Sequence, residues 1–208
     1  MPAFDTTLSF FVAAVLLALA PGPDNLTVLA QSLAHGRRAA FAFALGCVAG
    51  VLGHTAAVAA GLAAVIATSA TAFGVLKALG AAYLLYLAWQ AWRAPADTGA
   101  LGGTPAAPPA VLFRRGVLMN LTNPKVLLFF LALLPQFTDP ARGPVATQVL
   151  WLGLVFMVAA LLVFGAIAWF GARLGGVLRG SARAQRLLNR ATAVLFAALA
   201  LRLVTASR

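Results

Sequence analysis

The chain is a succession of long apolar runs separated by short polar or basic stretches. Six of these runs are long enough to cross a bilayer, because a spanning helix needs about 20 apolar residues. They cover residues 8–34, 39–66, 71–92, 113–136, 146–171 and 185–204. The pattern therefore predicts an all-α polytopic membrane protein with six transmembrane helices.

Two of the six runs are interrupted by proline near their middle. The first run is broken at Pro21, Gly22 and Pro23, and the fourth is broken at Asn123 and Pro124. A helix that stops in mid-membrane leaves backbone groups unpaired in hydrocarbon, so such a break is tolerated only inside protein or beside a water-filled cavity. The breaks therefore indicate the functional region of the protein.

A segment rich in Pro, Gly and Ala, residues 94–110, predicts a flexible cytoplasmic linker. It divides the chain into two three-helix halves, residues 1–93 and 111–208. Because three is odd, the second half is expected to lie upside down relative to the first. Inverted repeats are common in secondary transporters, and here the first helix of each half carries the proline break.

The basic residues predict how the helices cross the membrane. The loops after the first, third and fifth runs are basic, whereas the loops after the second and fourth carry no net charge. Since cytoplasmic loops are enriched in Lys and Arg, we expect an inner-membrane protein with both termini outside. The residues concerned are Arg37, Arg38, Arg93, Arg114, Arg115, Arg173, Arg179, Arg183, Arg186 and Arg190.

The composition supports a membrane protein. Hydrophobic residues make up 62% of the chain and charged residues 9%, with a mean hydropathy of +0.96, whereas a soluble domain carries roughly 25% charged residues. The net charge of +11 is spread between the apolar runs, so the expected partner is an anionic lipid surface and not nucleic acid. One cysteine and two histidines offer too few ligands for a structural metal site. Without HExxH, GxSxG or P-loop motifs, we expect no enzyme and no cofactor.

Residues of opposite charge follow the two breaks: Asp24 comes after Pro23, and Lys125 comes after Pro124. Each begins a half-helix whose positive N-terminal end points toward the membrane midplane, which suits a carboxylate. We hypothesise that both side chains face one central cavity. Lys125 and the helix ends would attract a substrate carboxylate and Asp24 a substrate ammonium, so a zwitterionic amino acid satisfies both.

Two other roles stay open for these charges. Asp24 and Lys125 could form a permanent ion pair that only locks the breaks, since charged groups inside membranes usually pair with each other. Asp24 is also the leading candidate for proton coupling, because the other acidic residues, Asp5, Asp97 and Asp139, lie at chain ends or in loops.

Four further polar side chains are candidates for the same site. Asn25, Asn120 and Asn123 lie beside the breaks, where they are expected to satisfy freed backbone groups. His54 lies in the middle of the second run. For a lone histidine, a hydrogen-bonded core role is favoured over a proton relay.

Lys77 and Tyr83, in the third run, have two interpretations each. Lys77 either faces the substrate or, as we favour, extends to the outer surface. Tyr83 either contacts substrate or belongs to an aromatic belt. Gly46, Gly50 and Gly53 give the second helix a smooth face for close packing. Such glycine spacing serves contacts within or between subunits, which leaves a homo-oligomer open.

The segments around the breaks resemble the LysE/RhtB family of bacterial amino-acid exporters. The resemblance is carried by PGPDNLTVLAQSLAHGRRAAFAFALG at 21–46 and FRRGVLMNLTNPKVLLFFLALLPQF at 113–137, with further matches at 53–69 and 77–93. It implies proton-driven export of an amino acid or derivative across the cytoplasmic membrane. It also implies that residues 21–25 and 123–125 carry the family's pattern.

Two other function classes stay open. One is a channel or uptake carrier for another small metabolite or ion. The other is a non-transporting membrane scaffold, against which the broken helices argue, because ordinary spans would suffice.

Overall fold

The computed structural model describes residues 1–68, 70–93, 107–180 and 182–205. Within the helices, the side chains of several stretches, including 62–73 and 172–180, are also outside the description. Throughout the described ranges the regular structure is helical, with no strand, which confirms the predicted all-α class. The helices are α1 (Phe4–Leu19), α2 (Pro23–Thr68), α3 (Ala70–Arg93), α4 (Pro109–Leu121), α5 (Pro124–Ala132), α6 (Val145–Gly180) and α7 (Ala182–Thr205). Two 3₁₀ turns, Leu134–Phe137 and Pro140–Arg142, connect α5 to α6.

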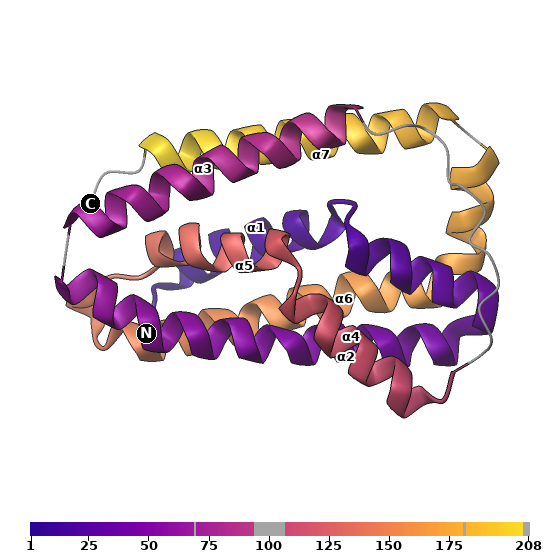
Figure 1. Cartoon of the computed structure of the whole chain (residues 1–208), viewed down its shortest axis with the longest axis horizontal. Helices are drawn as coiled ribbons and strands as arrows, with labels where there is room; N and C mark the ends of the chain where they lie inside the picture. The colour runs from indigo at the N-terminus through magenta and orange to yellow at the C-terminus, as the bar shows by residue number, and fades with distance from the viewer. Residues whose placement is uncertain (69, 94–106, 181, 206–208) are drawn as a thin grey trace.

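Helix α2 contains one sharp interruption. Gly36 has φ 79° and ψ 178°, a conformation that side-chain-bearing residues rarely adopt and that glycine adopts readily. Because Gly36 falls between the first and second predicted spans, α2 holds the end of one and all of the next. The molecule turns back on itself there, at the right-hand end of Figure 1.

Two described helical stretches are long and apolar enough to cross a membrane by themselves, Pro23–Gly61 and Val145–Gly171. The helix before the first break, α1, has 16 residues, and the helix after the second break, α5, has 9. At 1.5 Å per residue these are about 24 Å and 14 Å long, shorter than the roughly 30 Å hydrocarbon core. The six-span topology therefore stays a prediction.

The helices are arranged around α1 and α5, which lie in the middle of the molecule (Figure 1). On one side α2 packs along α4 and α6, and α6 also contacts α1. On the other side α3 packs along α7 and contacts α5. A cluster of aromatic rings, Phe10, Phe129, Phe130 and Phe156, fills the core between α1, α5 and α6, with neighbouring centroids 5.0 to 6.2 Å apart.

Glycines set the separation of α2 and α4. A Cβ atom on Gly46 would lie 2.0 Å from the Phe113 carbonyl oxygen, and one on Gly116 would lie 2.2 Å from the Phe43 carbonyl oxygen. Neither backbone can yield, so the helices approach this closely only because both positions lack a side chain. The prediction that the glycines of the second run form a close-packing face is confirmed.

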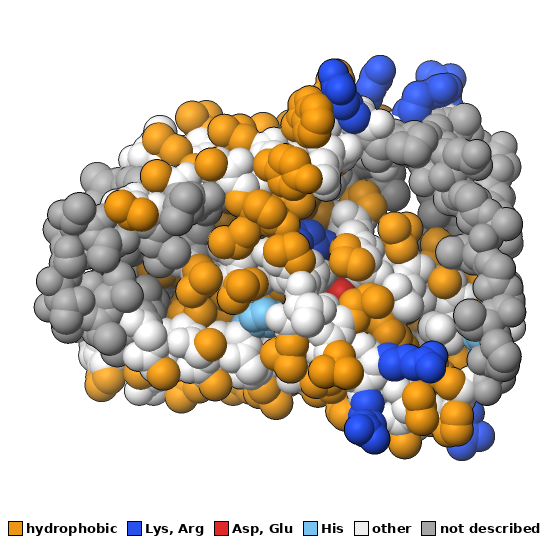
Figure 2. Space-filling view, viewed as in Figure 1, with side chains coloured by type: hydrophobic (Ala, Val, Ile, Leu, Met, Phe, Trp, Pro, Cys, Tyr) orange, Lys and Arg blue, Asp and Glu red, His pale blue; other side chains and the backbone are white. Residues whose placement is uncertain are grey.

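The two ends of the molecule differ. The N-terminus and the C-terminal end of α7 lie toward the left-hand end in Figure 1, and the Met1 ammonium donates a 3.1 Å hydrogen bond to the carbonyl oxygen of Arg142 in the α5–α6 connection. Exposed Lys and Arg side chains gather instead toward the end where α2 turns and α3 stops (Figure 2). Most of the predicted linker, 94–106, lies outside the described residues, and α4 begins at Pro109. The division into inverted halves stays a prediction.

Candidate functional site

The site forms where the C-terminal end of α1 meets the N-terminal ends of α2 and α5. Pro23 and Pro124 occupy the first positions of α2 and α5, where the missing N–H leaves no helical bond unmade. Asn123 caps α5, because its side-chain Oδ1 accepts a 3.0 Å hydrogen bond from the Lys125 backbone N–H. Asp24 and Lys125 therefore hold equivalent places in the first turns of two different helices.

Asp24 is a buried carboxylate with one free oxygen. Its exposed fraction is 1%, and its Oδ2 accepts a 2.9 Å hydrogen bond from the Asn120 side-chain amide. The positive end of α2 adds to the stabilisation of the negative charge. The other oxygen, Oδ1, is buried without a hydrogen-bond partner.

Lys125 is a buried ammonium that contacts the end of α1. Its Nζ donates to the carbonyl oxygens of Ala20 at 2.9 Å and Leu17 at 3.4 Å. These carbonyls lie at the negative end of α1, which favours a cation. No salt bridge joins the described side chains of Lys125 and Asp24, although the two charges interact at longer range. The direct ion pair considered as an alternative is therefore not formed in this arrangement. Gly22 provides the space, since a Cβ there would lie 2.8 Å from Nζ.

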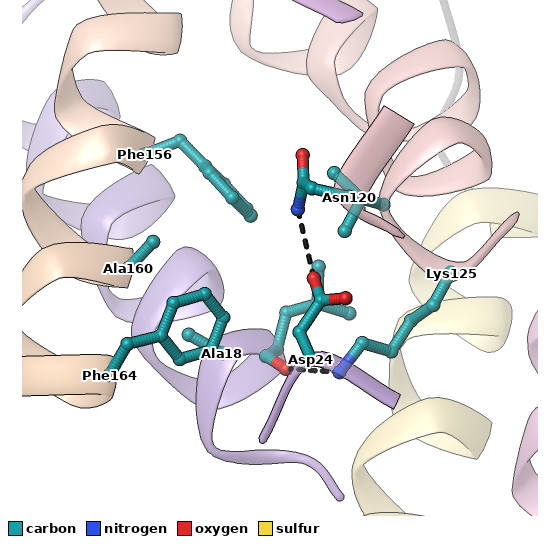
Figure 3. A pocket seen from close by; sticks show the side chains of 9 residues that line it. Ala18, Asp24, Asn120, Lys125, Phe156, Ala160 and Phe164 are labelled. Carbon is teal, nitrogen blue, oxygen red and sulfur yellow. Dashed lines mark hydrogen bonds between the residues drawn. The ribbon is translucent and has the colours of Figure 1, made fainter. Parts of the chain in front are cut away.

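Asp24, Asn120 and Lys125 line one small pocket, and Figure 3 shows them converging on it. The polar groups come from α2, α4 and α5, and the remaining walls are apolar. The apolar lining residues are Leu17, Ala18, Val126, Phe156, Ala160 and Phe164. The pocket has room for about one water molecule, so the site is closed around its polar groups.

The other predicted residues near the breaks are buried beside this pocket. Asn25 donates from its side-chain Nδ2 to the Ala18 carbonyl oxygen, tying α2 to α1 across the break. His54 donates from Nε2 to the Asn120 carbonyl oxygen at 2.9 Å, because a carbonyl can only accept. Asn25 and Asn123 thus bind backbone groups beside the breaks, as expected, and His54 is a hydrogen-bonded buried side chain. The Asn120 side chain differs from the expectation, because its amide binds the Asp24 carboxylate and not a backbone group. Asn25 Oδ1, Asn120 Oδ1 and Asn123 Nδ2 remain without partners.

Of the two candidates on α3, Tyr83 does not belong to the described lining of the pocket. Tyr83 is half-buried and lies against Tyr86, with ring centroids 5.9 Å apart. Their neighbour Trp89 continues the row, with its centroid 6.3 Å from that of Tyr86. This arrangement suits the aromatic-belt interpretation of Tyr83. The side chain of Lys77 lies outside the described residues.

The apolar wall on α6 was not foreseen from the sequence. Phe156, Ala160 and Phe164 are spaced four residues apart and therefore share one face of the helix. That spacing was visible in the sequence. It gave no signal, because nearly every neighbouring position of the run from 149 to 170 is also apolar.

The arrangement is suited to recognition of a small dipolar molecule. It offers one buried anion and one buried cation that no salt bridge joins, together with unpaired amide atoms. Within the described ranges, no three His, Cys, Asp or Glu side chains gather as potential metal ligands.

Comparison with known proteins decides the family. Residues 15–207 match the family model described as LysE type translocator. The chain belongs to this family. The resemblance seen in the sequence is thereby confirmed, and the family is one of membrane translocators and not of enzymes.

Relatives of this translocator match it over most of their length. A homoserine/homoserine lactone efflux protein of Salmonella typhi is 34% identical over 195 residues, 93% of each chain. An uncharacterized membrane protein of Vibrio cholerae is 36% identical over 83% of each chain. A leucine efflux protein of Enterobacter sp. is 28% identical over 95% of this chain and 94% of its own. No solved structure matches the chain.

Proposed function

We propose that this translocator exports an amino acid or amino-acid derivative across the bacterial cytoplasmic membrane. Its family and its relatives support the proposal, since two of them are named as efflux proteins, one for homoserine and homoserine lactone and one for leucine. The single observation that carries it is that Asp24 and Lys125 are buried in one pocket without forming an ion pair with each other.

In the proposed complex, the substrate ammonium binds the free Oδ1 of Asp24. Asn120 holds the other oxygen of the carboxylate, which fixes the orientation of Oδ1. The substrate carboxylate binds Lys125, whose Nζ then exchanges the carbonyls of α1 for a carboxylate. A zwitterion has no net charge and supplies a counter-charge to each of the two buried groups at once.

The small pocket corresponds to a closed state of the site. An amino acid enters only when the helices around the pocket separate. The pocket is lined by helices α1, α2, α4, α5 and α6. Rocking of one group of helices against the other exposes the pocket first to one side of the membrane and then to the other.

Six membrane crossings in two inverted halves, with both termini outside, remain our topology. The contact between Met1 and Arg142 supports it, because the N-terminus and the loop after the fourth span then lie on the same side. The gathering of basic side chains at the opposite end supports a cytoplasmic location for that end.

Proton coupling follows from a competition for Asp24. It is the acidic residue that lines the pocket, and a protonated carboxyl group cannot hold an ammonium by charge. Substrate and proton therefore exclude each other at the same oxygen. A carrier that returns empty only with Asp24 protonated moves one proton inward for each substrate molecule outward.

Counterflow in proteoliposomes tests the proposal. Vesicles containing the protein are loaded with unlabelled leucine or homoserine, and uptake of the labelled compound is followed with and without a pH gradient. We expect the exchange rate to saturate with substrate concentration and to increase when a pH gradient is imposed. Flux that rises linearly with concentration and needs no internal substrate would support the alternative of a channel.

A further inference from the structure

We propose that α6 carries the binding site for the substrate's side chain, formed by Phe156, Ala160 and Phe164, and that the site selects uncharged aliphatic side chains. The inference rests on the proposed function and adds a specificity determinant to it. The three residues line the pocket that contains Asp24, Asn120 and Lys125. They face these polar groups from the opposite wall, as Figure 3 shows.

The pocket is divided into a polar and an apolar part. With the ammonium and carboxylate of an amino acid held at Asp24 and Lys125, its Cα lies between them. The side chain must then point to the part of the lining that carries no polar group. That part is the α6 face, together with Leu17, Ala18 and Val126.

Burial makes the α6 face selective. Phe156, Ala160 and Phe164 are 3%, 1% and 5% exposed. A charged side chain placed there would lose its water without gaining a partner, since Asp24 is already bound to the α-ammonium. Lysine-like substrates are therefore excluded, and an aliphatic side chain gains from contact with the two rings.

Ala160 sets the length of the side chain that fits. It is the small residue between two phenylalanines on one helix face. Phe156 is held in place by Phe129 and Phe130, with ring centroids 5.5 and 5.0 Å away, so this wall cannot move aside easily. The methyl group of Ala160 therefore forms the floor of the gap between the rings, and the bulk at position 160 limits the depth available to the substrate.

The test is the ratio of two exchange rates, which is independent of the amount of protein. Counterflow of norleucine and of 2-aminobutyrate is measured for the wild type, Ala160→Val and Ala160→Gly. A change of one methylene in an apolar pocket alters discrimination about 10-fold or more. We expect Ala160→Val to lower the norleucine to 2-aminobutyrate ratio at least about tenfold, and Ala160→Gly to raise it. Ala166→Val, an exposed position on the same helix, is the matched control and leaves the ratio unchanged.

The outcomes separate this inference from the proposed function. If the wild type exchanges both compounds but neither variant at position 160 changes the ratio, the side-chain site is wrong while export stands. If Ala160→Val does not fold, Ala160→Gly alone decides by the same ratio. If the wild type exchanges ornithine as fast as norleucine, the proposed selection of uncharged side chains is also wrong. A wild type that exchanges none of these compounds overturns both proposals.

Discussion

Asn120 donates a 2.9 Å hydrogen bond from its side-chain amide to the carboxylate of Asp24. The bond joins the last turn of α4 to the first turn of α2, and so it connects the two proline breaks. Gly50 permits this contact, because a Cβ at that position would lie 2.8 Å from Cβ and 2.9 Å from Oδ1 of Asn120. The position of Asp24 thus depends on residues that are distant in sequence.

Gly22→Ala is predicted to impair transport without unfolding the protein. The added methyl group would lie 2.8 Å from Nζ of Lys125, and a flexible lysine end can move where a backbone cannot. The ammonium is then displaced from the Ala20 carbonyl and from the substrate carboxylate. We expect at least about a tenfold lower exchange rate, since displacement by 1 Å can cost about a hundredfold in a positioned site.

Gly61→Ala is the matched control for Gly22→Ala. Gly61 is exposed, and nothing lies within 4 Å of a Cβ placed there. Its exchange rate should equal that of the wild type. If Gly22→Ala also exchanges at the wild-type rate, Lys125 does not need its present position for transport.

The crossing of α2 and α4 predicts two strongly destabilising substitutions. Gly46→Ala and Gly116→Ala each place a methyl group within 2.2 Å of a carbonyl oxygen of the other helix. Overpacking of this kind costs about 1–3 kcal/mol or more, so both variants should lose several degrees of thermal stability in detergent. Gly74→Ala, where nothing lies within 4 Å, provides the control. If Gly46→Ala and Gly116→Ala both melt at the wild-type temperature, α2 and α4 can move apart without loss of stability.

His54→Gln is predicted to preserve both the transport rate and its pH dependence. The histidine donates one hydrogen bond to the Asn120 carbonyl oxygen, and a glutamine amide can donate the same bond. His54→Leu removes it and should lower stability by about 1 kcal/mol. The measurement is the exchange rate of each variant between pH 5 and pH 9. A shifted pH profile in His54→Gln would assign a proton-relay role to His54.

The proposed topology predicts which side of the membrane each loop faces. In a Cys47→Ala background, Ala141→Cys is placed in the α5–α6 connection and Ala34→Cys beside the turn at Gly36. Both positions are exposed. A membrane-impermeant maleimide added to intact cells should label the cysteine at 141 and leave the one at 34 unlabelled until the membrane is opened. The reverse pattern would place the termini in the cytoplasm.

Parts of the site were accessible from the sequence because the chemistry of a membrane is restrictive. Proline and charge in mid-span are tolerated only around a polar interior, which is why residues 21–25 and 123–125 pointed to one region. The sequence did not predict the hydrogen-bond partner of Lys125. Its ammonium binds the Ala20 carbonyl because of how α1 ends and because Gly22 leaves space for the lysine side chain.

The α6 face was hidden for a different physical reason. In a membrane helix, lipid-facing and interior positions are both apolar, so hydrophobic periodicity does not distinguish Phe156 and Phe164 from the exposed Leu154 and Leu161. Only the packing of α6 against α1 and α2 shows which face lies inward. The turn at Gly36, by contrast, falls in the loop that the sequence predicts between the first and second runs.

The central claim is that the buried carboxylate of Asp24 binds the substrate ammonium, and Asp24→Asn tests it most directly. Asparagine keeps the shape and can still accept the hydrogen bond from Asn120, but it removes the charge. Asp5→Asn, at an exposed acid, controls for the substitution, and elution in gel filtration controls for folding. In leucine counterflow we expect Asp5→Asn to exchange at the wild-type rate. A correctly folded Asp24→Asn should show no more exchange than liposomes without protein. Exchange by Asp24→Asn at the wild-type rate would contradict the account.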